Sequence, residues 1–276
     1  MNLLGFLCYN LAVAFSGPLR KFGSRTPTVT RFDSNEKYFE QRVADTSHYQ
    51  KLFAPYASFA NKTVLDLGCN RGYLLASFLQ RKNFNAIGAE LVSYYLKDAR
   101  RDYGDKIQFV QSTPTAIPLQ DNSVDVVYTI DTVEHLSRPK DIFNDVFRIL
   151  KPGGVFLVHF NPWLNPHGSH LDDVIPFPWS HVFFSMNTLL DVAERLYDSP
   201  HYDTACYYLD TEGNKKPVQG SRRMGQVFKF YDDQALQRST RGTAVYGHLS
   251  GKDRLRREHL QVKPHCSGPG ASPAAR

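Results

Sequence analysis

Two carboxylates and a run of small residues suggest a ligand-binding turn in the first half of the chain. Asp66 is followed by Gly68, Asn70 and Gly72 at alternate positions, and Glu90 ends a later apolar stretch. Glycines at a turn let the backbone approach a ligand closely, and the first N–H groups of a helix are free to donate hydrogen bonds. A carboxylate beside such a turn would repel a pyrophosphate, but it can bind a positively charged amino group. A second carboxylate, at Glu90, can accept both hydroxyls of a ribose.

The surrounding segments alternate between strand and helix patterns, which indicates how these groups are positioned. Short apolar runs predict strands at 62–68, 85–90, 106–112, 123–131 and 155–160. Helical spacing predicts helices at 72–83, 91–104, 138–154 and 185–199. Strands that are apolar throughout are typical of a parallel sheet covered on both faces, and such sheets bind ligands beyond the carboxyl ends of their strands. The site is therefore expected at that edge.

An adenosine that carries an amino acid and no phosphate satisfies both carboxylates. S-adenosylmethionine has this composition, because its ammonium group suits Asp66 and its ribose suits Glu90. Its sulfonium is an electrophilic methyl donor, so the protein needs only to position a nucleophile and exclude water. The residues thus predict S-adenosylmethionine as the cofactor. No metal site is expected, since the histidines and cysteines show no recognised ligand spacing.

Four stretches resemble motifs of the class I S-adenosylmethionine-dependent methyltransferases, close to the type 11 group. In chain order they are VLDLGCNRG, IGAELV, TAIPLQDNSVDVVYTIDTVEHL and RILKPGGVFLVHF, and the resemblance covers roughly residues 45–160. It implies an α/β fold with a doubly wound, mostly parallel, seven-stranded sheet. The last two strands would form a closing antiparallel pair, for which 201–211 and 225–233 have suitable patterns.

The resemblance also implies roles for individual residues. Asp66 and the backbone around Gly68 would hold the methionine amino end, and Gly72 would keep the turn clear. Glu90 would grip the ribose hydroxyls, and Leu91 would lie against the adenine.

Three further positions concern the same site. Asp131, just past the fourth strand, would face the methionine or substrate side of the pocket. Asn70 replaces the middle glycine of the first motif, which asparagine tolerates because it enters the left-handed region readily. Thr113 stands where related proteins often have an aspartate that accepts the adenine amino group, and its hydroxyl is a weaker acceptor.

The segment 161–185 follows the fifth strand and is expected to cover the substrate side of the site. Such long stiffened segments are usually functional. It contains Pro-Trp pairs and histidines, and we expect an apolar wall there from Trp163, Phe177 and Trp179. A histidine is the usual general base for a hydroxyl nucleophile. His170, which has acidic neighbours, is the first candidate for this catalytic role, and His135 is the second.

The two ends of the chain differ from its middle. Residues 1–30 form an apolar and then basic extension, for which a helix packed on the domain, an interfacial membrane anchor through residues 1–25, and a cleaved signal are the alternatives. A methyltransferase domain is expected over 31–245, and a disordered basic tail over 246–276. Four scattered cysteines fit a reducing compartment, so a cytoplasmic location, with or without membrane association, is expected.

The leading hypothesis is methyl transfer to a small molecule, at oxygen, with a lipid-linked acceptor as a variant. Nucleic-acid binding is not expected, because the net charge of +6 is mild and few aromatic residues interleave the basic tail. Two alternatives stay open. One is a macromolecular methyltransferase acting on RNA or protein, and the other is a degenerate scaffold subunit that binds S-adenosylmethionine without catalysis.

Overall fold

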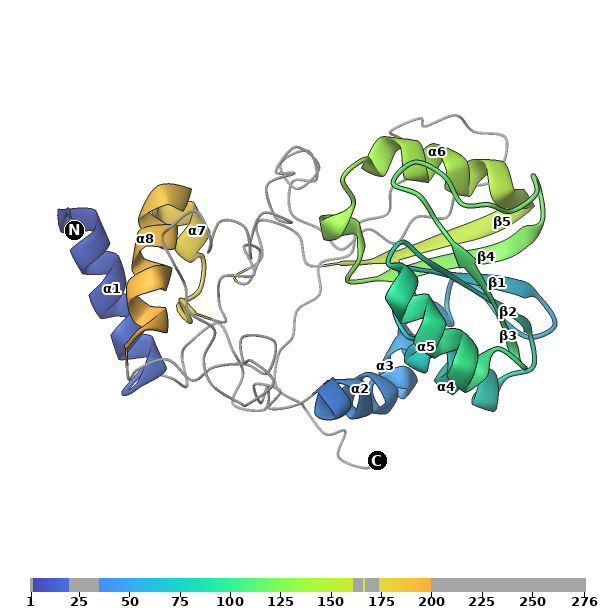
Figure 1. Ribbon diagram of the computed structural model, residues 1–276, viewed down its shortest axis with the longest axis horizontal. Coiled ribbons are helices and arrows are strands. Elements are labelled where there is room, and N and C mark those ends of the chain that lie inside the picture. The colour runs from blue at the N-terminus through green and yellow to red at the C-terminus, as the bar shows by residue number, and fades with distance from the viewer. Residues whose placement is uncertain (1, 20–34, 161–165, 167–173, 200–276) are drawn as a thin grey trace, which may run out of the picture.

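The computed structural model describes residues 2–19, 35–160, 166 and 174–199 (Figure 1). A five-stranded sheet in the order β3-β2-β1-β4-β5 forms its larger part, and each neighbouring pair of these strands is parallel. The strands are β1 (Thr63–Leu67), β2 (Asn85–Glu90), β3 (Ile107–Gln111), β4 (Val124–Ile130) and β5 (Leu150–His159). The doubly wound parallel sheet expected from the sequence is thus confirmed.

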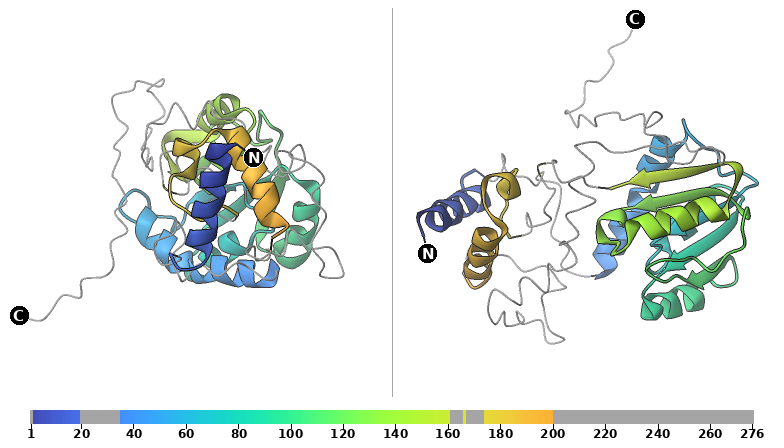
Figure 2. Two further views of the ribbon diagram at one scale, coloured as in Figure 1. Left: turned by 90° about the vertical axis from the view of Figure 1, so that its left-hand side faces the viewer. Right: turned by 90° about the horizontal axis from the view of Figure 1, so that it is seen from above.

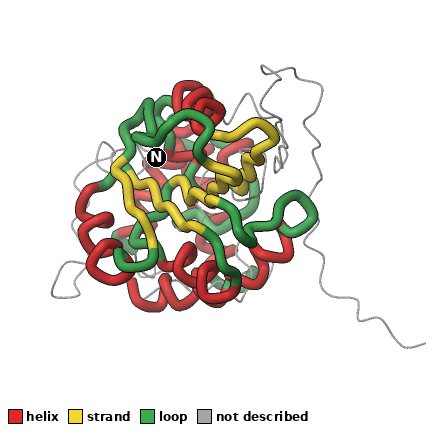
Figure 3. Tube along the Cα trace, turned by 90° about the vertical axis from the view of Figure 1, so that its right-hand side faces the viewer, coloured by secondary structure: helices red, strands yellow, loops and turns green. Residues whose placement is uncertain are grey.

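Helices cover both faces of this sheet (Figure 3). They are α2 (Asn35–Ala44), α3 (Thr46–Phe53), α4 (Tyr73–Arg81), α5 (Ser93–Tyr103) and α6 (Pro139–Ile149). On one face, α3, α4 and α5 bury an aromatic cluster that includes Phe53, Phe78 and Tyr128. On the other face, Ile142 and Val146 of α6 pack on apolar side chains of the strands. Burial of apolar side chains on both faces explains why the strands read as continuous apolar runs.

The helix expected over 138–154 is shorter in the structure, and the fifth strand begins earlier than predicted. Helix α6 ends at Ile149, because Leu150 already pairs with Val124 of β4. The carbonyls of Arg148 and Ile149 accept hydrogen bonds from Asn122 and Ser123 in the preceding loop. The backbone groups at the end of the helix are therefore used by tertiary contacts, which local sequence patterns do not report.

The antiparallel closing pair expected from 201–211 and 225–233 lies outside the described residues, as does the tail 246–276. The seven-strand count is therefore still a prediction. None of the helices within the described ranges is both long enough and apolar enough to cross a membrane.

A second, smaller group of helices lies apart from the sheet (Figures 1 and 2). It consists of α1 (Leu3–Ser16), α7 (Ser180–Phe183) and α8 (Met186–Tyr197). Cys8 and Ala12 of α1 are buried in one apolar cluster with Leu189 and Val192 of α8. The apolar N-terminal stretch is therefore a helix, as one of the alternatives proposed, and it packs on α8.

Arg148 ties the loop that follows β3 to α6. Its guanidinium donates to the carbonyls of Ile117 and Leu119 at 2.9 and 2.8 Å, and to the carboxylates of Asp121 and Asp145. Asp145 in turn accepts a hydrogen bond from the Ile117 amide. One side chain thus fixes the loop that leads into β4.

We expect Arg148→Met to lower the free energy of unfolding by about 2 kcal/mol, because two backbone carbonyls lose a charged donor. About a third of the Arg148 side chain is exposed, and the solvent there weakens its interactions, so we do not expect a larger loss of stability. Urea unfolding followed by fluorescence measures the change. Arg101→Met is the matched control, since Arg101 makes only exposed ion pairs with Asp98 and Asp102, and it should change stability by less than about 0.5 kcal/mol. Equal losses in the two variants would contradict this role of Arg148.

Candidate functional site

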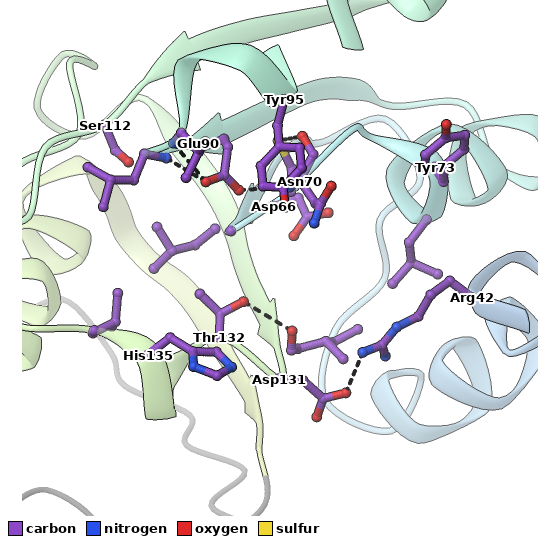
Figure 4. Close-up of a pocket in the computed structure, with 18 of the residues that line it drawn as sticks. Arg42, Asp66, Asn70, Tyr73, Glu90, Tyr95, Ser112, Asp131, Thr132 and His135 are labelled. Atoms are coloured by element: carbon purple, nitrogen blue, oxygen red, sulfur yellow. Dashed lines mark hydrogen bonds and ion pairs between the residues drawn. The ribbon is translucent and has the colours of Figure 1, made fainter. Parts of the chain in front are cut away.

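A cavity of about 460 Å³ opens at the carboxyl ends of β1, β2 and β4 (Figure 4). Its walls come from the β1–α4 turn, the ends of β2 and β4, and one side of α2. The lining residues are Phe39, Arg42, Asp66, Leu67, Gly68, Cys69, Asn70, Tyr73, Leu74, Glu90, Leu91, Val92, Tyr95, Ser112, Ile130, Asp131, Thr132, His135 and Leu136. The sheet edge predicted for the site is therefore where the cavity lies.

The β1–α4 turn needs small residues chiefly because of contacts within the protein. Gly68, Asn70 and Gly72 all have left-handed φ values, of 83°, 50° and 78°. A Cβ on Gly68 would lie 2.4 Å from the side chain of Thr132, and one on Gly72 would lie 2.9 Å from the ring of Phe109. Gly72 does not line the cavity, and its contact with Phe109 is a packing reason for glycine there, while the expectation that it keeps the turn clear for a ligand stays a prediction.

Asn70 completes the same turn. Its φ of 50° confirms that asparagine adopts the left-handed conformation here in place of glycine. Its side-chain oxygen accepts a hydrogen bond from the Arg71 amide at 2.8 Å. The substitution therefore keeps the shape of the turn and fixes the following residue.

We expect Gly68→Ala to lower the free energy of unfolding by about 3 kcal/mol, through left-handed strain and the clash with Thr132 together. Gly153→Ala separates the two causes, because Gly153 has a φ of 79° and no atom within 4 Å of the added methyl group. That control should lose only about 1 kcal/mol. Thermal unfolding of both variants, and of Gly68→Ala combined with Thr132→Gly against Thr132→Gly alone, measures the difference, since alanine at 132 would keep a Cβ 2.9 Å from the added methyl group. If the double variant recovers nothing, the clash is not the cause.

Asp66 is a buried carboxylate in the wall of the cavity. Burial raises its pKa from 3.8 to about 7, and the negative charge of Glu90 adds to this increase. Near neutral pH the group is therefore poised between its two protonation states. A cation placed in the cavity would favour the charged carboxylate.

Glu90 is held in a fixed orientation by backbone donors. Oε1 accepts the amides of Leu91 and Val92 at 2.8 and 2.9 Å, and Oε2 accepts the amide of Asn70 at 2.9 Å. A carboxylate has about four acceptor positions, so about one stays open on Oε2. The predicted grip on both ribose hydroxyls would require one of these amides to give way, whereas one hydroxyl can bind without any change.

Asp131 forms the opposite wall together with Arg42 and His159, two residues that were not predicted from the sequence to lie in the site. Its carboxylate lies 2.9 Å from Nη2 of Arg42 and 3.2 Å from Nδ1 of His159. Burial favours the protonated acid, but His159 and Arg42 outweigh it and lower the pKa of Asp131. Figure 4 shows Arg42 and Asp131 facing one another across this wall. Asp131 is thus a fixed, ionised carboxylate on the side where the methionine or the substrate was expected.

Two aromatic rings, Phe39 of α2 and Tyr73 of α4, close the remaining side. Phe39 stacks on Tyr73 with 4.1 Å between ring centroids, and the guanidinium of Arg71 lies over both rings at 5.3 and 5.6 Å. Arg71 also pairs with Asp98 of α5 at 2.9 Å. Sequence periodicity gave no signal that α2 reaches the site.

The remaining predicted residues divide between the cavity and other places. Leu91 and His135 line the cavity, as expected. Thr113 does not line it, because its hydroxyl accepts the Ala116 amide at 3.0 Å within a local turn, and the neighbouring Ser112 lines the cavity instead. His170 lies outside the described residues.

The apolar wall proposed for the segment 161–185 is wrong in the part that the structure describes. The ring of Phe177 lies 6.0 Å from that of Phe15 in α1, inside the buried cluster of the smaller helical group. Trp179 caps α7 and does not line the cavity. Trp163 lies outside the described residues. Burial away from water stabilises an aromatic ring in any apolar cluster, and the cluster that buries Phe177 is formed with α1.

The parallel sheet and the cavity at its carboxyl edge agree with the class I, Rossmann-like methyltransferase fold expected from the sequence, and comparisons with known proteins point to the same class. Residues 65–158 match the family model described as "Methyltransferase domain". An uncharacterized methyltransferase of Mycobacterium ulcerans is 32% identical over 138 residues, which are 49% of this chain and 54% of that protein. A sterol 24-C-methyltransferase of Pneumocystis carinii is 28% identical over 131 residues, which are 46% of this chain and 34% of that protein.

An S-adenosylmethionine-dependent methyltransferase from Mesorhizobium loti has a TM-score of 0.40 and 20% identity, with 44% of this chain and 57% of that chain covered. The chain spans about half the length, or less, of the curated relatives described above.

Proposed function

We propose that this protein transfers a methyl group from S-adenosylmethionine to a small molecule, at oxygen. The observation that carries the proposal is the pair of acids, Asp66 and Glu90, in the wall of one cavity. Arg42 is the only arginine or lysine among the lining residues, and it already pairs with Asp131. A phosphate-bearing nucleotide would therefore meet net negative charge, whereas a ligand that carries an ammonium and a sulfonium would be attracted.

The residues present fit this cofactor. A cavity of about 460 Å³ falls within the range of small-ligand sites, roughly 300–1,000 Å³. Asp66, whose pKa is about 7, would gain its charge beside the ammonium group. Glu90 would accept a ribose hydroxyl at the open position on Oε2, and Leu91 and Ser112 would flank the adenine. When bound, the cofactor supplies an electrophilic methyl group.

The acceptor would bind on the side of Asp131 and His135. The stacked rings of Phe39 and Tyr73 would exclude water there, which helps because the transfer needs alignment more than it needs acid–base groups. His135 and His170 stay candidates for the base that takes the proton of a hydroxyl acceptor. His159, whose Nδ1 lies 3.2 Å from the carboxylate of Asp131, is a third imidazole at this end of the sheet. A lipid-linked acceptor remains a variant of the same proposal.

Binding of the cofactor is tested first by calorimetry with S-adenosylmethionine and with ATP. We expect S-adenosylmethionine to bind at least about tenfold more tightly, because of the two acids. Transfer is then tested with cofactor labelled on the methyl group, in the presence of extracted small molecules, lipids and RNA.

The outcomes separate the proposal from its alternatives. Label in a small molecule or a lipid supports the proposal when the chemical shift of the transferred methyl group shows that it is bonded to oxygen, and base stability of that bond then distinguishes an ether from an ester. Label in RNA or in protein alone would indicate a macromolecular methyltransferase. Cofactor binding without transfer to any fraction would favour the scaffold alternative, and absence of binding would overturn the proposal.

A further inference from the structure

The first two turns of α1 expose an apolar surface. Leu3, Leu4, Phe6 and Leu7 have exposed fractions of 82, 56, 58 and 49%. The whole helix, Leu3–Ser16, contains no charged residue. Several large apolar side chains exposed side by side on a protein surface generally mark a site that binds another protein, a membrane or an apolar ligand. We call these four residues the α1 tip.

The rest of α1 is fixed, so the tip is held in position. Gly5, Cys8 and Ala12 are buried, and Cys8 and Ala12 lie in the cluster that α8 and Phe177 complete. The side chain of Asn2 caps the helix by accepting the amide of Gly5 at 2.8 Å. The exposed leucines and the phenylalanine thus project from a helix that is already anchored along its other side.

Helix α7 adds apolar groups to the same helical group. Val182 and Phe183 are exposed, Phe183 by 72%, and Trp179 precedes them at the helix cap. This second exposed site comes from a distant part of the sequence. The apolar exposure is therefore a property of the helical group, and not only of the end of the chain.

The charged residues near α1 in the sequence indicate what kind of partner the α1 tip would bind. Residues 1–32 include Arg20, Lys21, Arg25 and Arg31 and contain no aspartate or glutamate. An apolar helix surface followed by basic residues is the combination that binds a bilayer with anionic headgroups, since apolar insertion and electrostatic attraction add. The exposed polar neighbours of the tip are Asn2 and Asn10, and α1 carries no charged side chain that could pair with a protein partner at the rim of the contact.

We propose that the α1 tip inserts into the surface of an anionic membrane. In this arrangement the leucines and Phe6 leave water for the acyl boundary, and the four basic residues that follow α1 in the sequence add an electrostatic attraction to the anionic headgroups. The larger domain would remain outside, with the carboxyl ends of its strands on the side toward the helical group (Figures 1 and 2). The proposal concerns a membrane surface and does not depend on the methyl acceptor.

The test is flotation of the full chain with vesicles of phosphatidylcholine alone and of phosphatidylcholine with phosphatidylglycerol. We expect binding to the mixed vesicles, weakened by salt, and at least about tenfold weaker binding for Leu4→Glu combined with Leu7→Glu. Asn187→Glu in α8 is the control, because it adds one negative charge at an exposed polar position of the same helical group, as each of the two tip substitutions does. It should lose no more than about twofold.

The other outcomes overturn the proposal. Equal binding of the tip variant and the wild type would mean that other residues meet the lipid. Equal binding to both vesicle types would remove the role of anionic headgroups. A dimer in light scattering that the tip variant abolishes, together with absent flotation, would make the tip a contact between two copies. Circular dichroism and cofactor binding of each variant verify that the fold and the cavity are intact, which keeps this test separate from that of the methyltransferase activity.

Discussion

Asp66→Asn is expected to weaken the binding of S-adenosylmethionine about 100-fold. The substitution keeps the shape of the side chain but removes the buried charge that would meet the ammonium group, and the loss of one partner of a buried charged pair costs about 3 kcal/mol. Calorimetry measures the affinity, and thermal unfolding should show that the variant is no less stable, because a buried carboxylate has been made neutral. An unchanged affinity would remove Asp66 from the site.

The same carboxylate should make cofactor binding depend on pH. Asp66 has a pKa of about 7 in the folded protein, so it is mostly protonated below that pH and must lose a proton before it can pair with an ammonium group. Affinity should therefore rise about tenfold per unit from pH 5 to 7 and level off above about pH 8. The stabilisation of the protein by the cofactor should increase over the same interval.

A ligand without the amino acid provides the matched control. 5′-Methylthioadenosine keeps the adenosine and the sulfur but has no ammonium group. Its affinity should be within about threefold for the wild type and Asp66→Asn, and nearly independent of pH between 5 and 8. If it followed the same pH profile as S-adenosylmethionine, the titrating group would act on the fold and not on the amino group.

Glu90→Gln is expected to reduce both stability and binding. The carboxylate accepts the amides of Asn70, Leu91 and Val92, and the NH₂ group of a glutamine would face at least one of these donors. A buried donor left without an acceptor next to a lost charge costs about 3 kcal/mol of unfolding free energy. For a chain of this size the midpoint of thermal unfolding should fall by about 6–12 °C.

Affinity separates the role of Glu90 from that of Asp66. Glu90→Gln should weaken S-adenosylmethionine and 5′-methylthioadenosine alike, by about 100-fold, since both carry the ribose. Glu40→Gln in α2 is the control, because Glu40 is exposed, and it should change neither property. A Glu90→Gln variant as stable as the wild type would contradict the role assigned to the three amide bonds.

The sheet and one side of the cavity could be predicted because they depend on local patterns. Buried parallel strands read as short apolar runs, and Asp66, Gly68 and Glu90 lie directly at their ends, so the sequence placed them at the correct edge. The roles of the glycines were less accessible. The side chains that require them, Thr132 and Phe109, lie on other strands and their loops, and no short sequence window contains both members of these contacts.

The other side of the cavity depends on which segments become neighbours. His159 reaches Asp131 because β5 pairs with β4 so that Ile130 and His159 are partners. The order of strands in a sheet cannot be predicted from either strand alone. The position of His159 at the end of a predicted strand was nevertheless a usable indication that it lies near the site. Arg42 comes from a helix well before the first strand, and its ion pair with Asp131 forms only after the chain has folded back.

Two residues at the rim of the cavity have a left-handed backbone conformation. Asn70 and Asp131 both have φ values of 50°, and each such residue costs the backbone about 1 kcal/mol. Asn61 and Asn122 share this conformation, but they precede β1 and β4 and so sit at the opposite edge of the sheet. A more thermostable form of the protein is therefore best sought by placing glycine at 61 and 122, where relaxing the main chain leaves the cavity unchanged.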